Sequence, residues 1–269
     1  MTDPNPIDAY SPAEIAARVE AAGIAKVKLP FLQTVTLGAL AGTFISFGAL
    51  FFILVTTDSG LAIGVERLLG GVAFSLGLIL VVIAGAELFT GNNLIVIAWA
   101  DRKITFVALL RNWVLVYVAN FAGAFATALL VALSGVLDLG DGAIGAKAVA
   151  VAESKAALTF GEAFFRGIMC NALVCLAIWI AMAAHDVAGK ILAIVFPITA
   201  FVALGFEHSV ANMFMFPLGM IASPEAAASG LTVGAFMANL VPVTLGNIVG
   251  GSVFVALVYY LIYIRGRTA

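Results

Sequence analysis

The feature that most constrains this chain is a set of six apolar segments, each long enough to cross a membrane. A bilayer core of about 30 Å requires about 20 mainly apolar residues per helix. A lone strand in lipid would leave its backbone polar groups unpaired, so all six segments are expected to be helices. They are Thr34 to Thr57, Arg67 to Ala100, Phe106 to Ser134, Thr159 to Ala184, Lys190 to Ile221 and Leu231 to Ile264. The sequence therefore predicts an all-α integral membrane protein.

The composition supports this class and excludes others. Hydrophobic residues make up 63% of the 269 residues and charged residues 10%, against about 45–50% and about 25% in soluble domains. The net charge of -2 and the lack of a basic block argue against nucleic acid as a partner. Cys170 and Cys175 are too few for a disulfide scaffold or a four-cysteine metal site, and we expect no metal and no cofactor.

Two parts of the chain are expected. Residues 1–30 form a cytoplasmic N-terminal part with an amphipathic helix, which begins at the capping box Ser11-Pro12-Ala13-Glu14. This helix is expected to lie along the membrane or against the bundle. Its apolar face carries Ile15, Val19 and Ala22. Residues 31–269 form a single transmembrane domain.

Turn and charge signals separate the six segments. They are Asp58-Ser59-Gly60, Asp101-Arg102-Lys103, the polar stretch Gly135 to Leu158, His185-Asp186 and Ser223-Pro224-Glu225. Met1 to Tyr10 is polar and has no apolar core of a cleavable signal peptide.

Lysine and arginine are expected to accumulate on the cytoplasmic side. With both termini inside and the loops alternating, the cytoplasmic side holds Arg18, Lys26, Lys28, Arg102, Lys103, Arg111, Lys190, Arg265 and Arg267. The outer side holds Arg67, Lys147, Lys155 and Arg166. The excess inside places both termini in the cytoplasm.

Polar residues interrupt the second and fifth segments, and the two interruptions resemble each other. Glu87 and Asn92 align with Glu207 and Asn212 at an offset of 120. A second pattern, N-x7-N-x2-G, begins at Asn112 and again at Asn239. Three helices followed by three similar ones cross in opposite directions, because three is odd. The sequence predicts a 3+3 inverted repeat with broken second and fifth helices, whose ends meet near the midplane and offer N–H groups to an anion.

Ionisable side chains at membrane depth are costly and are therefore candidates for function. His208 is the histidine at this depth, and histidine titrates nearest to physiological pH. It can supply a proton to a carboxylate, attract an anion as a cation, or simply pack in the core with a bond to the backbone. An interruption of a helix leaves backbone N–H groups without a partner in the helix. Four polar side chains are expected to accept hydrogen bonds from these groups: Glu87, Asn92, Glu207 and Asn212.

Apolar residues beside the interruptions have two interpretations. They either fill the core or form constrictions that exclude hydrated ions by dewetting. They are Phe74, Leu78, Leu88, Phe89 and Phe201. Lys155, just before the fourth segment, is either solvated or concentrates anions in a vestibule.

Three runs resemble the signatures of the formate/nitrite transporter family: Ala86 to Gly91, Gly205 to Met213 and Asn239 to Asn247. The resemblance spans nearly the whole chain, and it includes a fourth-segment motif at Asn171 to Ala177. Asn5-Pro6 and Thr43 to Ser46 are similar to the formate channel branch. The resemblance implies an aquaporin-like protomer of six helices that assembles as a homopentamer. We expect it in the inner (cytoplasmic) membrane, with lipid around it.

The resemblance also implies which residues line the path. The family's central histidine corresponds to His208, its loop threonine to Thr90, its fourth-helix asparagine to Asn171 and its vestibule lysine to Lys155. Its paired glutamate and asparagine correspond to Glu207 and Asn212. Its constrictions correspond to Phe74 and Leu78 on one side and to Leu88, Phe89 and Phe201 on the other.

The expected function is passage of small monovalent anions, chiefly formate, together with protons. A bare charge in an apolar constriction costs several kcal/mol, so formate is expected to pass as the neutral acid after protonation by His208. Gly91-Asn92 is closer to the nitrite branch, which leaves nitrite, acetate and lactate as alternatives. A water or glycerol channel is a remote alternative, because neither interruption carries Asn-Pro-Ala. No His-Glu-x-x-His or Gly-x-Ser-x-Gly signature indicates an enzyme.

Overall fold

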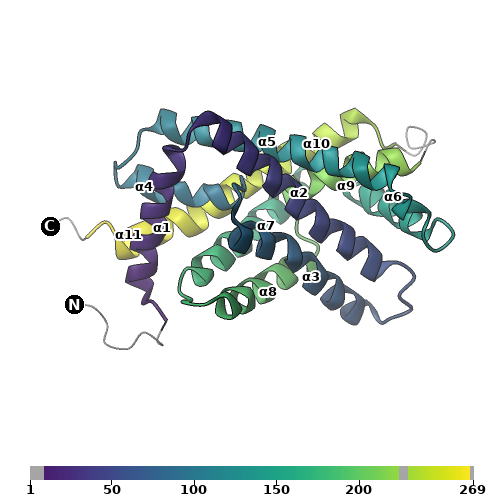
Figure 1. Cartoon of the computed structure of the whole chain (residues 1–269), viewed down its shortest axis with the longest axis horizontal. Helices are drawn as coiled ribbons and strands as arrows, with labels where there is room; N and C mark the ends of the chain where they lie inside the picture. Colours follow the sequence, from purple (N-terminus) through teal and green to yellow (C-terminus); the bar gives the residue numbers. More distant parts are fainter. Residues whose placement is uncertain (1–8, 224–229, 267–269) are drawn as a thin grey trace.

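The structure is a computed structural model that describes residues 9–223 and 230–266 (Figure 1). Three positions used above lie outside these ranges: Asn5-Pro6, Pro224-Glu225 and Arg267. So does most of Met1 to Tyr10. In the described part of the chain, all regular structure is helical.

Five helical stretches are long and apolar enough to cross a membrane. They are α2 (Phe31–Thr56), α3 (Ile63–Leu80) with the π-helical η1 (Val81–Gly85), α5 (Phe106–Leu133), α7 (Phe160–Ala181), and α10 (Val233–Ile248) continued by η4 (Val249–Leu257) and α11 (Val258–Tyr263). The fifth expected segment forms two shorter helices, α8 (Val187–Ala203) and α9 (Ser209–Ala222). The second expected segment continues after η1 as the 3-10 helix η2 (Gly91–Ile95) and α4 (Val96–Ala100).

Glycine allows the chain to leave helical geometry at both polar stretches. Gly85, the last residue of η1, has φ +87°, and Gly205, two residues after α8, has φ +72°. This left-handed region is costly for residues with a Cβ and open to glycine. The backbone returns to helix at Gly91 in one stretch and at Ser209 in the other. Both stretches thus carry non-helical backbone directly before a new helix.

Two helix pairs cross so closely that their backbones touch. In the α2–α5 pair, a Cβ on Gly123 would collide with the carbonyl oxygen of Ala39. Where η4, the continuation of α10, crosses α7, a Cβ on Gly250 would collide with the carbonyl oxygen of Ile168. Small residues at such crossings let helices approach and gain van der Waals contact without a hydrophobic driving force. These crossings fix the frame that holds the polar stretches.

The connection between α5 and α7, expected as the polar stretch Gly135 to Leu158, has helical structure of its own. It contains a short 3-10 helix, η3 (Val136–Asp138), and the 14-residue helix α6 (Ala143–Ala156). Ile144, Ala148 and Ala152 are buried on one face of α6, which packs against α9. Alanines make this face too weakly apolar to stand out in the sequence.

The N-terminal helix α1 (Pro12–Val27) has the predicted capping box at Ser11 and Glu14. Its buried face includes Ile15 and Val19 and contacts η2, α4, α5 and α11. Of the two placements left open by the sequence, the helix takes the one against the bundle. Figure 1 shows α1 crossing one end of the bundle beside α4 and α11, with α6 near the opposite end.

Candidate functional site

Two cavities approach the polar stretches, and none of the described residues lines both of them. The first has a volume of about 370 Å³ and is bordered by α6; we call it the α6 cavity. The second has a volume of about 610 Å³ and is bordered by α1; we call it the α1 cavity. Because α1 and α6 lie near opposite ends of the bundle, the cavities enter from opposite ends.

His208 lies at the inner limit of the α6 cavity and caps helix α9. Its side chain is buried, with 2% of the residue exposed, yet it contributes to the cavity wall. The backbone N–H of Ala211 donates to Nδ1 at 3.1 Å. Nδ1 therefore carries no hydrogen, and the ring is neutral with its hydrogen on Nε2. Nε2 lies 2.9 Å from Thr90 Oγ1, so the ring donates to the threonine hydroxyl.

Thr90 lies beside His208 and Asn171 lies beside Thr90, and neither residue lines either cavity. The side-chain nitrogen of Asn171 donates to the carbonyl oxygens of Thr90 at 3.2 Å and Asn247 at 2.7 Å. It also lies 3.0 Å from Asn93 Oδ1. The amide of Asn171 is thus directed at protein acceptors and holds the backbone at Thr90, rather than pointing into open space.

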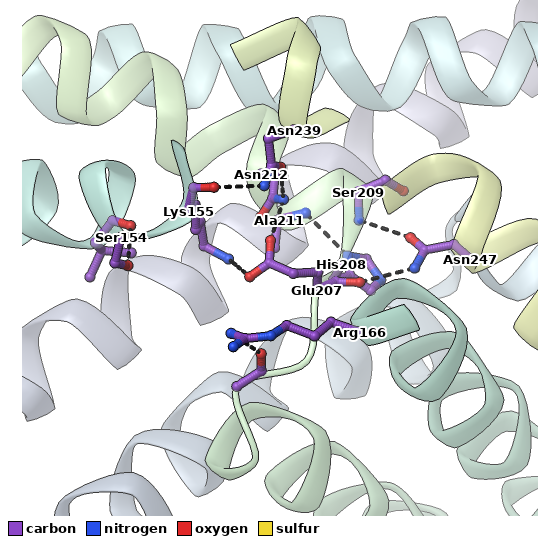
Figure 2. Close-up of polar contacts among 12 residues, drawn as sticks. Ser154, Lys155, Arg166, Glu207, His208, Ser209, Ala211, Asn212, Asn239 and Asn247 are labelled. Atoms are coloured by element: carbon purple, nitrogen blue, oxygen red, sulfur yellow. Dashed lines mark hydrogen bonds and ion pairs between the residues drawn. The ribbon is translucent and has the colours of Figure 1, made fainter. Parts of the chain in front are cut away.

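A closed set of polar side chains lies beside His208 on the α6 side, as Figure 2 shows. Lys155 Nζ lies 2.8 Å from Glu207 Oε1, and the other carboxylate oxygen accepts from Asn212 Nδ2 at 2.7 Å. Asn212 Nδ2 also donates to Asn239 Oδ1 at 2.7 Å. Asn239 Nδ2 donates to the backbone carbonyl of Lys155 at 2.9 Å. Each carboxylate oxygen of Glu207 therefore has a side-chain donor.

An equivalent set lies on the α1 side. Lys26 Nζ is 2.6 Å from Glu87 Oε1, and Asn92 Nδ2 donates to Glu87 Oε2 at 2.7 Å. Asn92 Nδ2 also donates to Asn112 Oδ1 at 2.9 Å. Lys26, Asn112 and Asn239 were not expected at the site. The asparagines stood in the repeated N-x7-N pattern, whereas Lys26 gave no signal because it is 61 residues from Glu87.

Backbone groups freed at the two stretches are bound by Asn120 and Asn247, two asparagines that were not among the expected Glu87, Asn92, Glu207 and Asn212. Asn120 Oδ1 accepts from Phe89 N, and Asn247 Oδ1 accepts from Ser209 N, both at 2.9 Å. Their amide nitrogens donate to the carbonyls of Glu87 and Glu207. Within the described residues, no backbone N–H donates to either carboxylate. An amide both accepts and donates, so one side chain binds an N–H group and a carbonyl oxygen at once, whereas an ionised carboxylate can only accept.

The apolar residues divide between the cavities differently from the expectation. Phe74 and Phe201 both line the α6 cavity, with ring centroids 5.5 Å apart. Leu88 lines the α1 cavity, while Leu78 and Phe89 line neither. The resemblance grouped Phe201 with Leu88 and Phe89, and this grouping is wrong: Phe201 belongs with Phe74. All five are buried, with at most 3% exposed.

Basic residues are concentrated at the cavities. The α6 cavity contains Arg67, Lys147, Lys155 and Arg166, the four basic residues assigned to the outer side, together with Glu66 and Glu207. The α1 cavity contains Lys26, Lys190 and Glu87. Basic groups in a cavity with low-dielectric walls raise the local concentration of anions. Both entrances therefore favour anions over cations.

Comparisons with known proteins agree with this geometry. The model of the family "Formate/nitrite transporter" matches residues 13–261. "Formate channel FocA" of Escherichia coli (strain K12) is 43% identical over 280 residues, which cover 98% of each chain. "Formate channel BtFdhC" of Bacillus thuringiensis is 41% identical over 256 residues, covering 94% of this chain and 96% of the relative.

Two solved structures are similar over nearly the whole fold. One, described as "Pentameric formate channel with formate bound", has a TM-score of 0.80 and 41% identity, and covers 87% of this chain and 98% of the solved chain. The other, "FNT family ion channel", has a TM-score of 0.84 and 31% identity, and covers 93% and 98%. These relatives are channels or transporters, and the helical chain with its apolar spans is a multi-pass membrane protein. The chain belongs to the formate/nitrite transporter family.

Proposed function

We propose that this protein conducts formate and similar small monovalent anions through a path that joins the α6 cavity to the α1 cavity. One observation carries the proposal: His208, on the wall of the α6 cavity, is hydrogen-bonded to Thr90, and Leu88, two residues before Thr90, lies on the wall of the α1 cavity. The relatives named as formate channels support formate as the substrate. Measuring the transport of nitrite, acetate and lactate beside that of formate tests the selectivity of the path.

We propose that the transmembrane domain crosses six times as a 3+3 inverted repeat, with the second and fifth passes broken at the polar stretches. Matched bonds support the repeat. Glu87 N donates to Leu37 O at 3.1 Å, and Glu207 N donates to Arg166 O at 3.3 Å. The Lys–Glu–Asn–Asn sets are matched as well. A chance similarity between apolar helices would not place the same hydrogen bonds and ion pairs at equivalent positions of the two halves.

Formate crosses the apolar constrictions as the neutral acid in this proposal. A bare carboxylate beside Phe74 and Phe201, or beside Leu88, would lose water without gaining partners, at a cost of several kcal/mol. Adding a proton removes most of this cost. Lys155 concentrates the anion, and the His208–Thr90 pair provides the hydrogen bonds next to the constriction.

His208 supplies the proton. The ring takes up a proton from water in the α6 cavity and releases one to a carboxylate oxygen of formate, which forms the O–H bond of the acid and leaves the ring neutral. A permanently charged ring that only attracts anions is disfavoured, because Nδ1 would then carry a hydrogen facing the N–H of Ala211. The bond from Ala211 instead favours the neutral ring between transfers.

The test is formate uptake by proteoliposomes across external pH. We expect uptake by the wild-type protein to rise as pH falls, because more protons reach the ring. His208→Ala should lower the rate about 100-fold or more, and His208→Asn should also flatten the pH profile. His185→Asn, at the other histidine, is the matched control and should behave as wild type. An unchanged rate and profile in both His208 variants would remove the ring from the mechanism.

We propose an inner-membrane location with both termini in the cytoplasm, so that the α6 cavity opens outside. The clustering of the four expected outer basic residues at the α6 cavity supports this orientation. Residues 1–30 then form a cytoplasmic helical part and residues 31–269 the lipid-embedded part. Cysteine labelling from each side, at a residue introduced in α6 and at one introduced before α1, tests the orientation. Labelling of both from the same side would contradict it.

A further inference from the structure

Four basic side chains line the α6 cavity, and only two have a carboxylate partner. Lys147 Nζ lies 3.3 Å from Glu66 Oε1, and Lys155 Nζ lies 2.8 Å from Glu207 Oε1. Arg67 and Arg166 have no carboxylate within salt-bridge distance in the described part of the chain. The cavity therefore contains two positive groups that have no salt-bridge partner among the described residues.

The two guanidinium groups approach each other at Gly205. Arg67 Nη1 donates to the carbonyl of Ala203 at 3.1 Å, and Arg166 Nη1 donates to the carbonyl of Gly205 at 3.4 Å. A Cβ on Gly205 would lie 3.3 Å from Arg67 Nη1 and 3.9 Å from Arg166 Nη1. Each guanidinium has five N–H donors, so several stay available to a ligand. In Figure 2 the Arg166 side chain extends toward the side on which Lys155 lies.

The other half of the chain offers an internal comparison. Leu37 lies 129 positions before Arg166, and the carbonyls of both accept the N–H of the glutamate in their polar stretch. Leu37 lines the α1 cavity as Arg166 lines the α6 cavity. The same backbone role is thus filled by an apolar residue in one half. Holding the polar stretch does not require an arginine at this position.

We propose that Arg67 and Arg166 form an anion-binding subsite in the α6 cavity, which takes small carboxylates and similar planar oxyanions before they reach Lys155 and His208. The subsite rests on the proposed function and deepens it. A planar guanidinium matches a carboxylate with two parallel hydrogen bonds. An anion between the two groups also offsets their mutual repulsion. Capture at this cavity is therefore stronger than at the α1 cavity.

The experiment measures formate flux against formate concentration in vesicles that hold the protein in one orientation. Arg166→Leu introduces the residue found at the equivalent position, and Arg67→Gln removes the second charge. We expect the double variant to raise the half-saturating concentration about three- to tenfold for flux that enters through the α6 cavity. Maximum flux, and entry from the α1 side, should stay within about twofold of wild type.

Two controls distinguish anion binding at the two arginines from a nonspecific electrostatic attraction by positive charge. Lys103→Gln removes one positive charge, as Arg67→Gln alone does, from an exposed residue outside both cavities, and it should leave the half-saturating concentration unchanged. Arg166→Lys with Arg67→Lys keeps the charge but not the planar fork, and should behave like the double neutral variant. Full recovery by the lysines, or an equal effect of Lys103→Gln, would overturn the subsite.

The phosphate of a phospholipid headgroup is also an oxyanion that arginine can bind, and Arg67 is exposed, so lipid could reach it. Phospholipid that co-purifies with the protein is therefore quantified for the wild type and the double variant. Loss of bound lipid with an unchanged half-saturating concentration would assign the arginines to a headgroup and overturn the proposal. A wild type that carries no formate refutes the proposed function itself. A wild type that carries formate but shares its half-saturating concentration with the double variant refutes the subsite alone.

Discussion

At the scale of single residues, the paired lysine and glutamate beside each polar stretch are the most sensitive contacts. The side chain of Glu207 is 5% exposed and that of Lys155 13%, against 7% for Glu87 and 30% for Lys26. Removing one partner of a buried pair leaves an uncompensated charge, which costs about 3–5 kcal/mol. The α6-side pair, being less exposed, should be the more costly one to break.

We therefore expect Lys155→Met to lower the free energy of unfolding by about 3–5 kcal/mol, and Lys26→Met to lower it by less. Adding Glu207→Gln to Lys155→Met should restore most of the loss, because no buried charge then lacks a partner. Urea unfolding of the purified protein in detergent measures both effects. Losses that simply add in the double variant would show that the two side chains do not act as a pair.

Much of the site could be predicted from the sequence, because intramembrane polar residues are few. His208, Thr90, Glu207 and Asn212 were singled out by residue type and by resemblance, and the structure brings them close to one another. Lys26 was missed because a lysine on a surface helix carries no sign of its distant partner. The bridging role of Asn247 was missed because it depends on which peptide groups face the side chain.

At the scale of helices, the crossing of α2 with α5 and the crossing of α7 with η4, the continuation of α10, depend on the absence of a Cβ. Gly123→Ala and Gly250→Ala should each lower the free energy of unfolding by about 1–3 kcal/mol, because a methyl group would push against a carbonyl oxygen of the facing backbone. Gly161→Ala, in α7, is the matched control, since a Cβ there meets nothing within 4 Å. Thermal unfolding in detergent measures the difference. An equal change in all three variants would contradict close packing as the cause.

The start of α1 should respond to pH through Glu14. The hydroxyl and backbone N–H of Ser11 donate to its carboxylate and hold the pKa of Glu14 below the usual 4.5. Since the folded-state pKa is lowered, the stabilisation is present above about 4.5 and is lost as pH falls through the lower folded value. We expect the first turn of α1 to loosen in this range.

Hydrogen exchange of the α1 peptide, corrected for the intrinsic rate at each pH, measures this loosening between pH 3 and 7. Glu14→Gln keeps an acceptor at the capping position but does not titrate, so its corrected exchange should not change with pH. The same pH response in the wild type and in Glu14→Gln would show that another group controls this end of the helix.

At the scale of the whole molecule, each half of the chain supplies an amphipathic helix as well as its apolar helices. When the two halves of the sequence are aligned at an offset of 129 residues, α1 matches α6. The matched residues are Ile15 with Ile144, Val19 with Ala148 and Lys26 with Lys155. The first two pairs are buried, and each lysine lines the cavity bordered by its own helix. The α5–α7 connection is therefore the counterpart of the N-terminal helix, and comparison at this offset would have revealed α6.

We expect the purified protein to be a homopentamer, as the solved formate channel is described. Apolar side chains cover the outside of the protomer, including Val107 at 74% and Leu133 at 84% exposure, and neighbouring protomers and lipid together would cover them. Native mass spectrometry in detergent should give five times the 27.8 kDa chain mass. A monomer mass at all protein concentrations would contradict the assembly, and a fully denatured sample provides the single-chain reference.

The sequence by itself determined the class of fold, the apolar segments, the polar stretches that interrupt them and the family. These follow from local hydropathy and from residues adjacent in the chain, because a bilayer demands about 20 apolar residues per crossing and penalises each polar exception. Only the tertiary structure decided that Lys26 pairs with Glu87, that Phe201 lies with Phe74, and that Arg67 meets Arg166 at Gly205. Those contacts join residues far apart in the chain, and their positions are set by helix crossings that no local pattern encodes.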